Sequence, residues 1–169
     1  MIILLNKRNK IDLNNKLSEL KISEISNLND LNKIVEDSDK KLNKGFWLFK
    51  EALDKDRKAY GGINKEPWYI RYFSVEYNGK IIGLGSYSLK FDNEYYSPNL
   101  HVFDIQTMPG YGGLSRFYFN FFEKIAKKNN KKYITLRCYE DSLQGLYRKF
   151  GFVLSDKEYN LMYKKLRVL

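Results

Sequence analysis

The stretch MPGYGGLSRFYF, residues 108–119, contains residues that could bind a phosphorylated ligand. Three glycines, Gly110, Gly112 and Gly113, come directly before a strongly apolar run that has the pattern of a helix. Backbone N–H groups at the start of a helix are oriented toward an anion, and glycine lets a ligand approach the main chain closely. A turn between a strand and a helix uses the same residues. The pattern therefore predicts either a phosphate-binding loop or a plain turn.

Few other side chains could carry catalysis, because the chain has one cysteine, Cys138, and one histidine, His101. Zinc sites of the usual Cys/His kinds are excluded, and a Ser/His or Cys/His triad would have to use His101. His101 and Asp104 lie at odd spacing on one expected strand, so we expect them to face opposite sides of the sheet. We interpret His101 as a hydrogen-bonding residue and Cys138 as part of the core.

Composition indicates a single folded domain. The chain has 169 residues, of which 43% are hydrophobic, so it is not a disordered sequence. The net charge of +10 is concentrated in lysine-rich patches at 40–44, 127–132 and 164–167. Such charge attracts nucleic acid, an acidic protein surface or a phosphorylated cofactor, although charge runs are more often solvated surface.

The compartment expected from the sequence is the cytoplasm. No segment has the roughly 20 apolar residues that a membrane span requires, and the apolar run at residues 1–5 is too short for a signal peptide. A single cysteine cannot form an intramolecular disulfide, which favours a reducing environment.

Hydrophobic periodicity and turn residues predict strands alternating with helices. Asn27 is expected to cap the first helix, and Asn78-Gly79 is the strongest hairpin signal. We expect strands at 20–26, 69–77, 80–91, 100–107, 132–139, 152–155 and 159–166, and helices at 27–38, 46–60, 114–128 and 141–150.

The helix at 114–128 is expected to present a broad apolar face. Lysines at its C-terminus suit the helix dipole. The residues of the expected face are Leu114, Phe117, Tyr118, Phe121 and Ile125.

This element order and two local patterns resemble the GCN5-related N-acetyltransferase (GNAT) family over about residues 20–166. In SLQGLYRKFGFV, 142–153, the residues Tyr147, Gly151 and Phe152 fall on the family's second signature, a helix with a tyrosine that runs into Gly-Phe and a strand. The family's phosphate loop falls on Gly110, Gly113 and Ser115. This chain departs from it at Gly110, where Gln or Arg is usual, and at Ser115, where Gly or Ala is usual.

The resemblance implies a single-domain acyl-CoA N-acyltransferase fold, in which helices flank a mixed, mostly antiparallel sheet. It implies acetyl-CoA as co-substrate and no metal. Residues 20–169 would form this domain, and residues 1–19 an extension of uncertain structure. The cofactor-binding residues it implies are Ile105, Gln106, Thr107, Gly110, Tyr111, Gly112, Gly113, Leu114, Ser115 and Arg116.

The same resemblance makes Tyr147 the candidate proton donor to sulfur and a main-chain N–H near the end of the 100–107 strand the group that polarises the carbonyl. Asp104 could accept a proton from the amine, directly or through water, or could simply pair with a lysine.

Two function classes follow. The first is an acetyl-CoA-dependent N-acetyltransferase that acts on an amine of a small molecule, a protein or an aminoacyl-tRNA. The second is a catalytically silent module of the same fold that binds nucleic acid or a protein through its basic surface. Tyr147 and the small residues Gly113 and Ser115 favour the first. Nucleic acid is a less favoured partner, no membrane is expected, and the sequence leaves both a monomer and a homodimer open.

Overall fold

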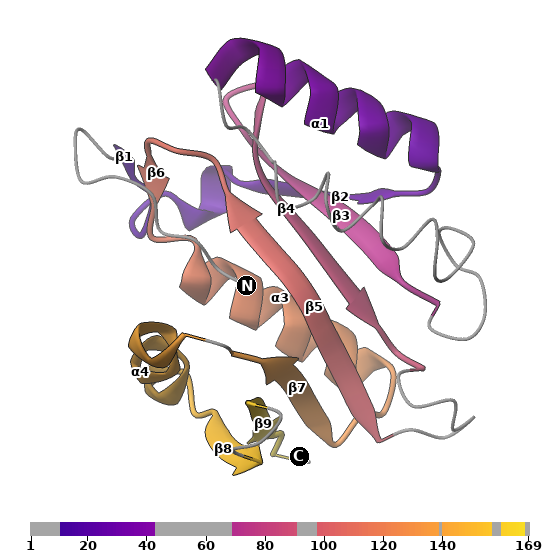
Figure 1. The fold of residues 1–169 in the computed structure, drawn as a ribbon, viewed down its shortest axis with the longest axis vertical. Helices are drawn as coiled ribbons and strands as arrows, with labels where there is room; N and C mark the ends of the chain where they lie inside the picture. Colours follow the sequence, from indigo (N-terminus) through magenta and orange to yellow (C-terminus); the bar gives the residue numbers. More distant parts are fainter. Residues whose placement is uncertain (1–10, 43–68, 91–97, 139, 157–159, 168–169) are drawn as a thin grey trace.

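The computed structural model describes residues 11–42, 69–90, 98–138, 140–156 and 160–167. Within these residues the centre of the fold is a seven-stranded sheet with the order β2-β3-β4-β5-β7-β9-β8 (Figure 1). Neighbouring strands are antiparallel except for β5 and β7. The expected α/β fold with a mixed, mostly antiparallel sheet is confirmed. The strands are β2 Lys21–Ile25, β3 Arg71–Tyr77, β4 Lys80–Ser88, β5 Asn99–Thr107, β7 Tyr133–Arg137, β8 Val153–Asp156 and β9 Leu161–Lys165.

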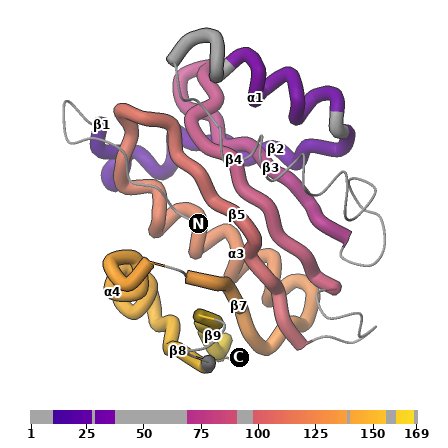
Figure 2. The backbone as a smooth tube through the Cα atoms, in the orientation of Figure 1, coloured from indigo at the N-terminus to yellow at the C-terminus, as the bar shows by residue number. Residues whose placement is uncertain are grey.

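Helices cover both faces of this sheet. Helix α1, Leu28–Leu42, lies on one face, and helix α3, Ser115–Lys128, lies on the other (Figure 2). Helix α4, Asp141–Lys149, follows β7, and a short 3-10 helix spans Leu17–Glu19. The helix expected at 46–60 lies outside the described residues.

Local sequence signals fix several of the element ends. The Asn27 side chain accepts a hydrogen bond from the Asp30 amide at 2.9 Å, so it caps α1 as expected. Asn78 and Gly79 have φ values of 49° and 72°, which a tight hairpin turn between β3 and β4 requires. Strand β4 ends earlier than expected, at Ser88.

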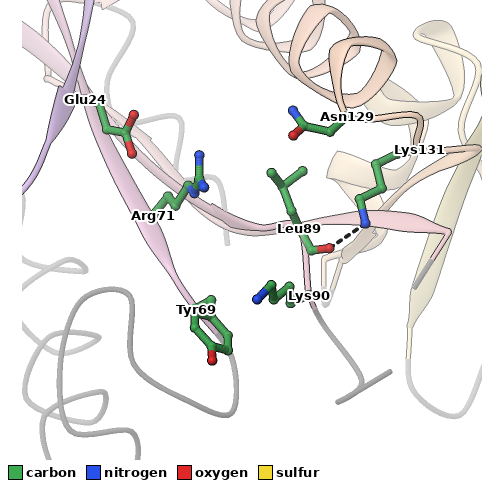
Figure 3. Close-up of a pocket in the computed structure, with 7 residues that line it drawn as sticks. All are labelled: Glu24, Tyr69, Arg71, Leu89, Lys90, Asn129 and Lys131. Atoms are coloured by element: carbon green, nitrogen blue, oxygen red, sulfur yellow. Dashed lines mark hydrogen bonds between the residues drawn. The ribbon is translucent and has the colours of Figure 1, made fainter. Parts of the chain in front are cut away.

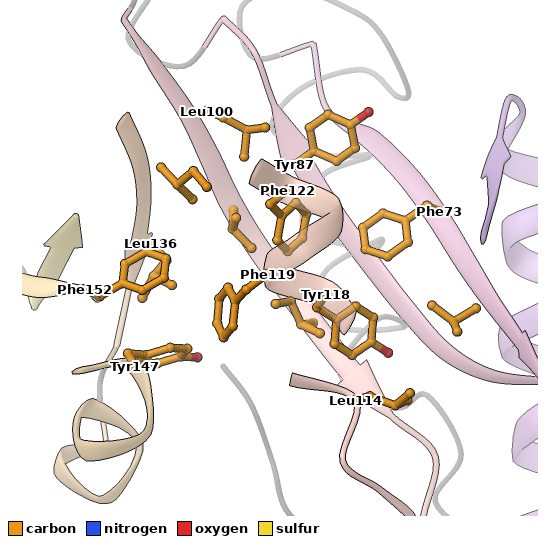
Figure 4. Packing of buried hydrophobic residues seen from close by; sticks show 14 of the residues in the cluster. Phe73, Tyr87, Leu100, Leu114, Tyr118, Phe119, Phe122, Leu136, Tyr147 and Phe152 are labelled. Carbon is orange, nitrogen blue, oxygen red and sulfur yellow. The ribbon is translucent and has the colours of Figure 1, made fainter. Parts of the chain in front are cut away.

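The main core lies between the sheet and α3, and its centre is aromatic (Figure 4). The Phe122 ring lies 5.7 Å from that of Phe73 and 6.0 Å from that of Tyr87, in edge-on contacts that suit ring quadrupoles. The apolar face expected for α3 is real but is rotated. Leu114 and Tyr118 of the expected set are buried, but Phe117, Phe121 and Ile125 are only partly buried. Phe119 and Phe122, which lie outside the expected set, are fully buried.

The first turn of α3 is tied to the end of β5. The Tyr118 hydroxyl donates to the Gln106 carbonyl oxygen at 3.3 Å. Gly83 on β4 leaves room for this contact, because a Cβ at that position would collide with the Tyr118 hydroxyl. The start of α3 therefore has a fixed position relative to the C-terminal end of β5.

Candidate functional site

The sheet opens between β5 and β7. The two strands pair in parallel from Asn99 with Tyr133 to Val102 with Leu136. Strand β5 then continues to Thr107, while β7 ends at Arg137 and leads toward α4 (Figure 1). Among the described residues, none pairs with the β7-facing edge of β5 at 103–107 in a sheet ladder. Such an edge can hydrogen-bond an extended ligand.

The glycine loop and the start of α3 lie just beyond this edge. Helix α3 begins at Ser115, and its N-cap residue Leu114 makes no side-chain capping hydrogen bond. Gly110 and Gly113 have φ values of 91° and 79°, a conformation that favours glycine. First-turn N–H groups that no side chain caps are suited to an anion, so the residues present fit a pyrophosphate. The exposed Arg116 could add a cation.

The N-terminal segment, from residue 11 onward, pairs with the glycine loop. Strand β1, Ile11–Asp12, pairs in parallel with β6, Tyr111–Gly112. The Ile11 amide donates to the Gly110 carbonyl at 2.8 Å, and the next residue after the strand, Leu13, is fully buried in the main core.

The contact between the N-terminal segment and the glycine loop leaves no room for a side chain at Gly113. An added Cβ there would lie 2.6 Å from Asp12 Oδ1 and 2.9 Å from the Asn14 amide nitrogen. Sequence reasoning left residues 1–19 without a structure, because a two-residue strand has no periodicity to detect.

Tyr147 projects from α4 into the core beside the opening. Its ring makes edge contacts with Phe119 at 5.8 Å and Phe152 at 6.0 Å (Figure 4). Burial raises the pKa of Tyr147 above its ordinary value, and Cys138, Glu140 and Asp104 raise it further. The phenol therefore keeps its proton at physiological pH, as a proton donor must.

The expectation that His101 and Asp104 face opposite sides of the sheet is wrong. Asp104 pairs with Ser86 and His101 pairs with Ser88, with an irregularity in the β4–β5 register between them. Cross-strand partners share a face, and so do Ser86 and Ser88, which are two residues apart. A β-bulge adds one residue to β5 and brings both side chains to the α1 face.

His101 is a buried structural residue. Its Nδ1 lies 2.9 Å from Thr135 Oγ1, and its ring packs edge-on against Phe103 at 4.8 Å. Burial, and secondarily the charge of Arg137, lowers the pKa of His101 from 6.5 to about 3. An imidazole whose pKa is this low is a weak base near neutral pH, which agrees with the interpretation of His101 as a hydrogen-bonding residue.

The residues between β7 and α4 have structural roles too. Cys138 is buried, as expected, and its thiol donates to the Glu140 carbonyl at 3.2 Å. Burial raises the pKa of this thiol, which keeps it protonated and unreactive. Glu140 is the N-cap residue of α4 but makes no side-chain capping bond.

The site thus combines an open strand edge, an anion-suited helix start and a protonated phenol. Within the described ranges there is no group of three or more His, Cys, Asp or Glu residues able to hold a metal ion. No helix in the same part of the chain is long and apolar enough to cross a membrane.

Comparison with known proteins agrees with this arrangement. A sequence profile of the acetyltransferase (GNAT) family matches residues 32–152. No curated protein sequence matches the chain. The structure resembles the PaiA N-acetyltransferase of Thermoplasma acidophilum, solved in complex with coenzyme A, with a TM-score of 0.58 and 16% identity over 87% of this chain and 99% of that one.

Two further solved structures share the fold. A GNAT-family acetyltransferase of Staphylococcus aureus has a TM-score of 0.59 and 14% identity over 88% of this chain and 99% of its own. The ribosomal-protein-S18-alanine N-acetyltransferase of Escherichia coli has a TM-score of 0.57 and 15% identity over 89% of this chain and 96% of its own. At these identities the likeness concerns the fold alone.

The buried His101 predicts a pH-dependent stability. Its pKa is lower in the folded than in the unfolded chain, so acid protonates the unfolded chain first. The stabilisation is complete above pH 6.5 and is lost as the pH falls toward 3. Lowering the pH from 7 to 5 should therefore reduce the free energy of unfolding by about 2 kcal/mol through this residue. Urea unfolding at both pH values measures it.

The matched variant is His101→Gln, which keeps a polar side chain near Thr135 but cannot titrate. Between pH 7 and pH 5, the free energy of unfolding of this variant should fall by about 2 kcal/mol less than that of the wild type. Equal pH dependence in the two proteins would show that His101 titrates normally.

Proposed function

This chain belongs to the acetyltransferase (GNAT) family, and we propose how its residues transfer an acetyl group from acetyl-CoA directly to an acceptor amine. The observation that carries the proposal is that the Tyr118–Gln106 hydrogen bond holds an uncapped helix start at Ser115 beside an open strand edge at 103–107. Residues 20–169 would be the catalytic domain, and the extension before them would support its glycine loop.

Binding of the co-substrate would use main chain almost throughout. The amides from Gly110 to Arg116 would hold the pyrophosphate, because N–H groups and the helix dipole both favour negative charge there. Ile105, Gln106 and Thr107 would bind the pantetheine arm along the open edge of β5, as an added strand binds a sheet. Ser115 departs from the family's loop pattern, but its side chain is small, so these amides would remain accessible to the pyrophosphate.

Acetyl-CoA supplies a thioester whose carbonyl carbon takes the lone pair of the amine while the C–S bond breaks. A main-chain N–H near the end of β5 would stabilise negative charge on the carbonyl oxygen. Tyr147 would donate its phenolic proton to the departing sulfur. The proton lost by the amine would restore the phenol through Asp104 or water, so the products are the amide and the free thiol of CoA.

Asp104 fits the role of proton acceptor by position. It lies on the α1 face of β5, is half buried, and is the last acidic residue before the glycine loop.

The acceptor we propose is an amine of a small molecule or a protein, in the cytoplasm. The single cysteine supports this compartment. A purely nucleic-acid-binding role is less favoured, because it would leave the anion-suited helix start and the buried phenol without a use. A panel of polyamines, aminoglycosides and peptides with free N-termini, assayed for thiol release from acetyl-CoA, would identify the class.

The first prediction concerns the helix start. Ser115→Asp should lower acetyl-CoA affinity at least about tenfold, because a carboxylate beside the pyrophosphate repels it. The same carboxylate should leave α3 as stable or slightly more stable, since acidic residues are favourable in a first helical turn. Calorimetric titration and thermal unfolding measure the two effects separately.

Ser115→Asn is the control, because it has nearly the same size as Asp and no charge. It should bind acetyl-CoA within a few-fold of the wild type. Unchanged affinity in a folded Ser115→Asp protein would place the pyrophosphate elsewhere.

The second prediction concerns the proton donor. Tyr147→Phe should lower the single-turnover rate by about 10- to 1000-fold with little change in acetyl-CoA affinity, in line with the usual size of general-acid catalysis. Phenylalanine keeps the ring contacts with Phe119 and Phe152, so packing is preserved.

Tyr133→Phe, which removes a hydroxyl from the half-buried Tyr133 of β7, is the matched control and should leave the rate unchanged. If both variants turn over at the wild-type rate when chemistry is rate-limiting, Tyr147 is a packing residue only.

A further inference from the structure

The N-terminal segment, residues 11–20, is anchored in the main core before the chain enters β2. Leu13 is fully buried and Leu20 is buried. Between them, Lys16 Nζ donates to the Tyr77 hydroxyl at the end of β3 at 2.8 Å, and the Lys16 amide donates to the Leu13 carbonyl oxygen at 3.0 Å. The segment therefore has a defined place on the fold.

The first residues of this segment contact the glycine loop, where β1 lies beside β6 (Figure 1). The segment donates two amides to loop carbonyls. The Ile11 amide donates to the Gly110 oxygen at 2.8 Å, and the Leu13 amide donates to the Gly112 oxygen at 3.1 Å. Leu13 thus joins the loop to the core, because its amide bonds the loop and its side chain is buried in the core.

A compact turn at this contact packs against Gly113. Asp12 Oδ1 accepts hydrogen bonds from the Asn14 amide at 3.0 Å and from the Asn14 side-chain nitrogen at 2.8 Å. Asp12 and Asn14 are also the residues that a Cβ at Gly113 would meet. The turn therefore limits the space available to Gly113, two residues before α3 begins at Ser115.

Ordering the glycine loop carries a high entropic cost. Glycine loses more backbone freedom on folding than any other residue, and three of the four residues at 110–113 are glycines. The hydrogen bond from the Tyr111 amide to the Met108 carbonyl oxygen, within the loop, is 3.3 Å long, longer than both bonds from the N-terminal segment. Contact with the segment therefore contributes to holding the loop in one conformation.

We propose that the N-terminal segment is a positioning element for acetyl-CoA, with Ile11 and Leu13 as its positioning residues. The inference rests on the proposed function, in which the amides from Gly110 to Arg116 hold the pyrophosphate. When the segment is docked, the loop is already in its anion-binding conformation. When the segment is undocked, only a fraction of the molecules is competent, and the apparent affinity for acetyl-CoA falls by that fraction. Such coupling is reciprocal, so acetyl-CoA must in turn stabilise the docked segment.

Ile11→Pro tests the contact through the backbone. Proline has no N–H, so this variant loses the hydrogen bond to Gly110, while the Ile11 side chain is 44% exposed and its loss should leave the core intact. The dissociation constant for acetyl-CoA, from calorimetric titration, should rise about threefold to tenfold, the range for one lost hydrogen bond. The kcat at saturating acetyl-CoA should stay at the wild-type value, because bound co-substrate orders the loop.

Ile11→Ala is the matched control, because it removes most of the same exposed side chain and keeps the amide. It should bind acetyl-CoA with wild-type affinity. An Ile11→Pro protein that binds acetyl-CoA as tightly as Ile11→Ala would overturn the proposal, and so would a loss of kcat without a change in affinity.

Leu13→Ala tests the same contact through the core, and Leu31→Ala is its control. Both leucines are fully buried, but Leu31 lies in the separate cluster between α1 and the sheet. Both variants should lower the temperature of thermal unfolding, because each leaves a cavity. Only Leu13→Ala should weaken acetyl-CoA binding, and Leu13→Met, which nearly conserves volume, should restore it. Equal acetyl-CoA affinity in Leu13→Ala and Leu31→Ala would make Leu13 a packing residue only and contradict the proposal.

Amide hydrogen exchange tests the reverse direction of the coupling. Saturating acetyl-CoA should slow exchange at the Ile11 and Leu13 amides of the wild type. Asn129 is the control amide, because it lines a pocket at the C-terminal end of α3 (Figure 3), about 20 Å from the glycine loop at 1.5 Å per residue. Its exchange should be the same with and without acetyl-CoA. Unchanged exchange at both segment amides would refute the coupling.

Ser115→Asp separates this proposal from the proposed function. If this variant binds acetyl-CoA as tightly as the wild type, the pyrophosphate lies elsewhere and both proposals fail. If it weakens binding while Ile11→Pro and Leu13→Ala do not, the co-substrate site stands and the positioning role alone is overturned.

Discussion

Strands β5 and β7 stop pairing beyond Val102 and Leu136, and the position of every group in the candidate active site follows from that ending. A strand edge that takes part in no sheet ladder can receive an extended ligand along its main chain, as an added strand does. The glycine loop, the start of α3 and the phenol of Tyr147 are arranged around it. A sheet that paired β5 to its end would have closed the site and left the helix start facing backbone.

The opening is held in place by packing on both sides. Tyr118 fixes the start of α3 against Gln106, and Leu13 anchors the N-terminal segment that pairs with the glycine loop. These contacts fix the loop before the co-substrate binds, which reduces the ordering cost of binding. The buried aromatic residues Phe119 and Phe152 do the same for the ring of Tyr147.

The sequence predicted the elements whose signals are local. Asn78-Gly79 gave the β3–β4 turn, Asn27 gave the start of α1, and the apolar run after the glycines gave α3. Non-local features were missed. The bulge that puts His101 and Asp104 on one face arises from the β4–β5 register, and no residue type marks it. The pairing of Ile11–Asp12 with the glycine loop joins residues about 100 positions apart in the sequence. The rotation of the apolar face of α3 depends on how Phe119 and Phe122 pack against the sheet.

Amide hydrogen exchange with and without acetyl-CoA tests the central claim most directly, because it reports on main chain, which is what the site offers. The account predicts slower exchange at residues 115–117 and along 103–107 when acetyl-CoA is bound, while the α1 amides are unaffected. Unchanged exchange at both segments under saturating acetyl-CoA, or protection confined to the opposite end of α3, would contradict it.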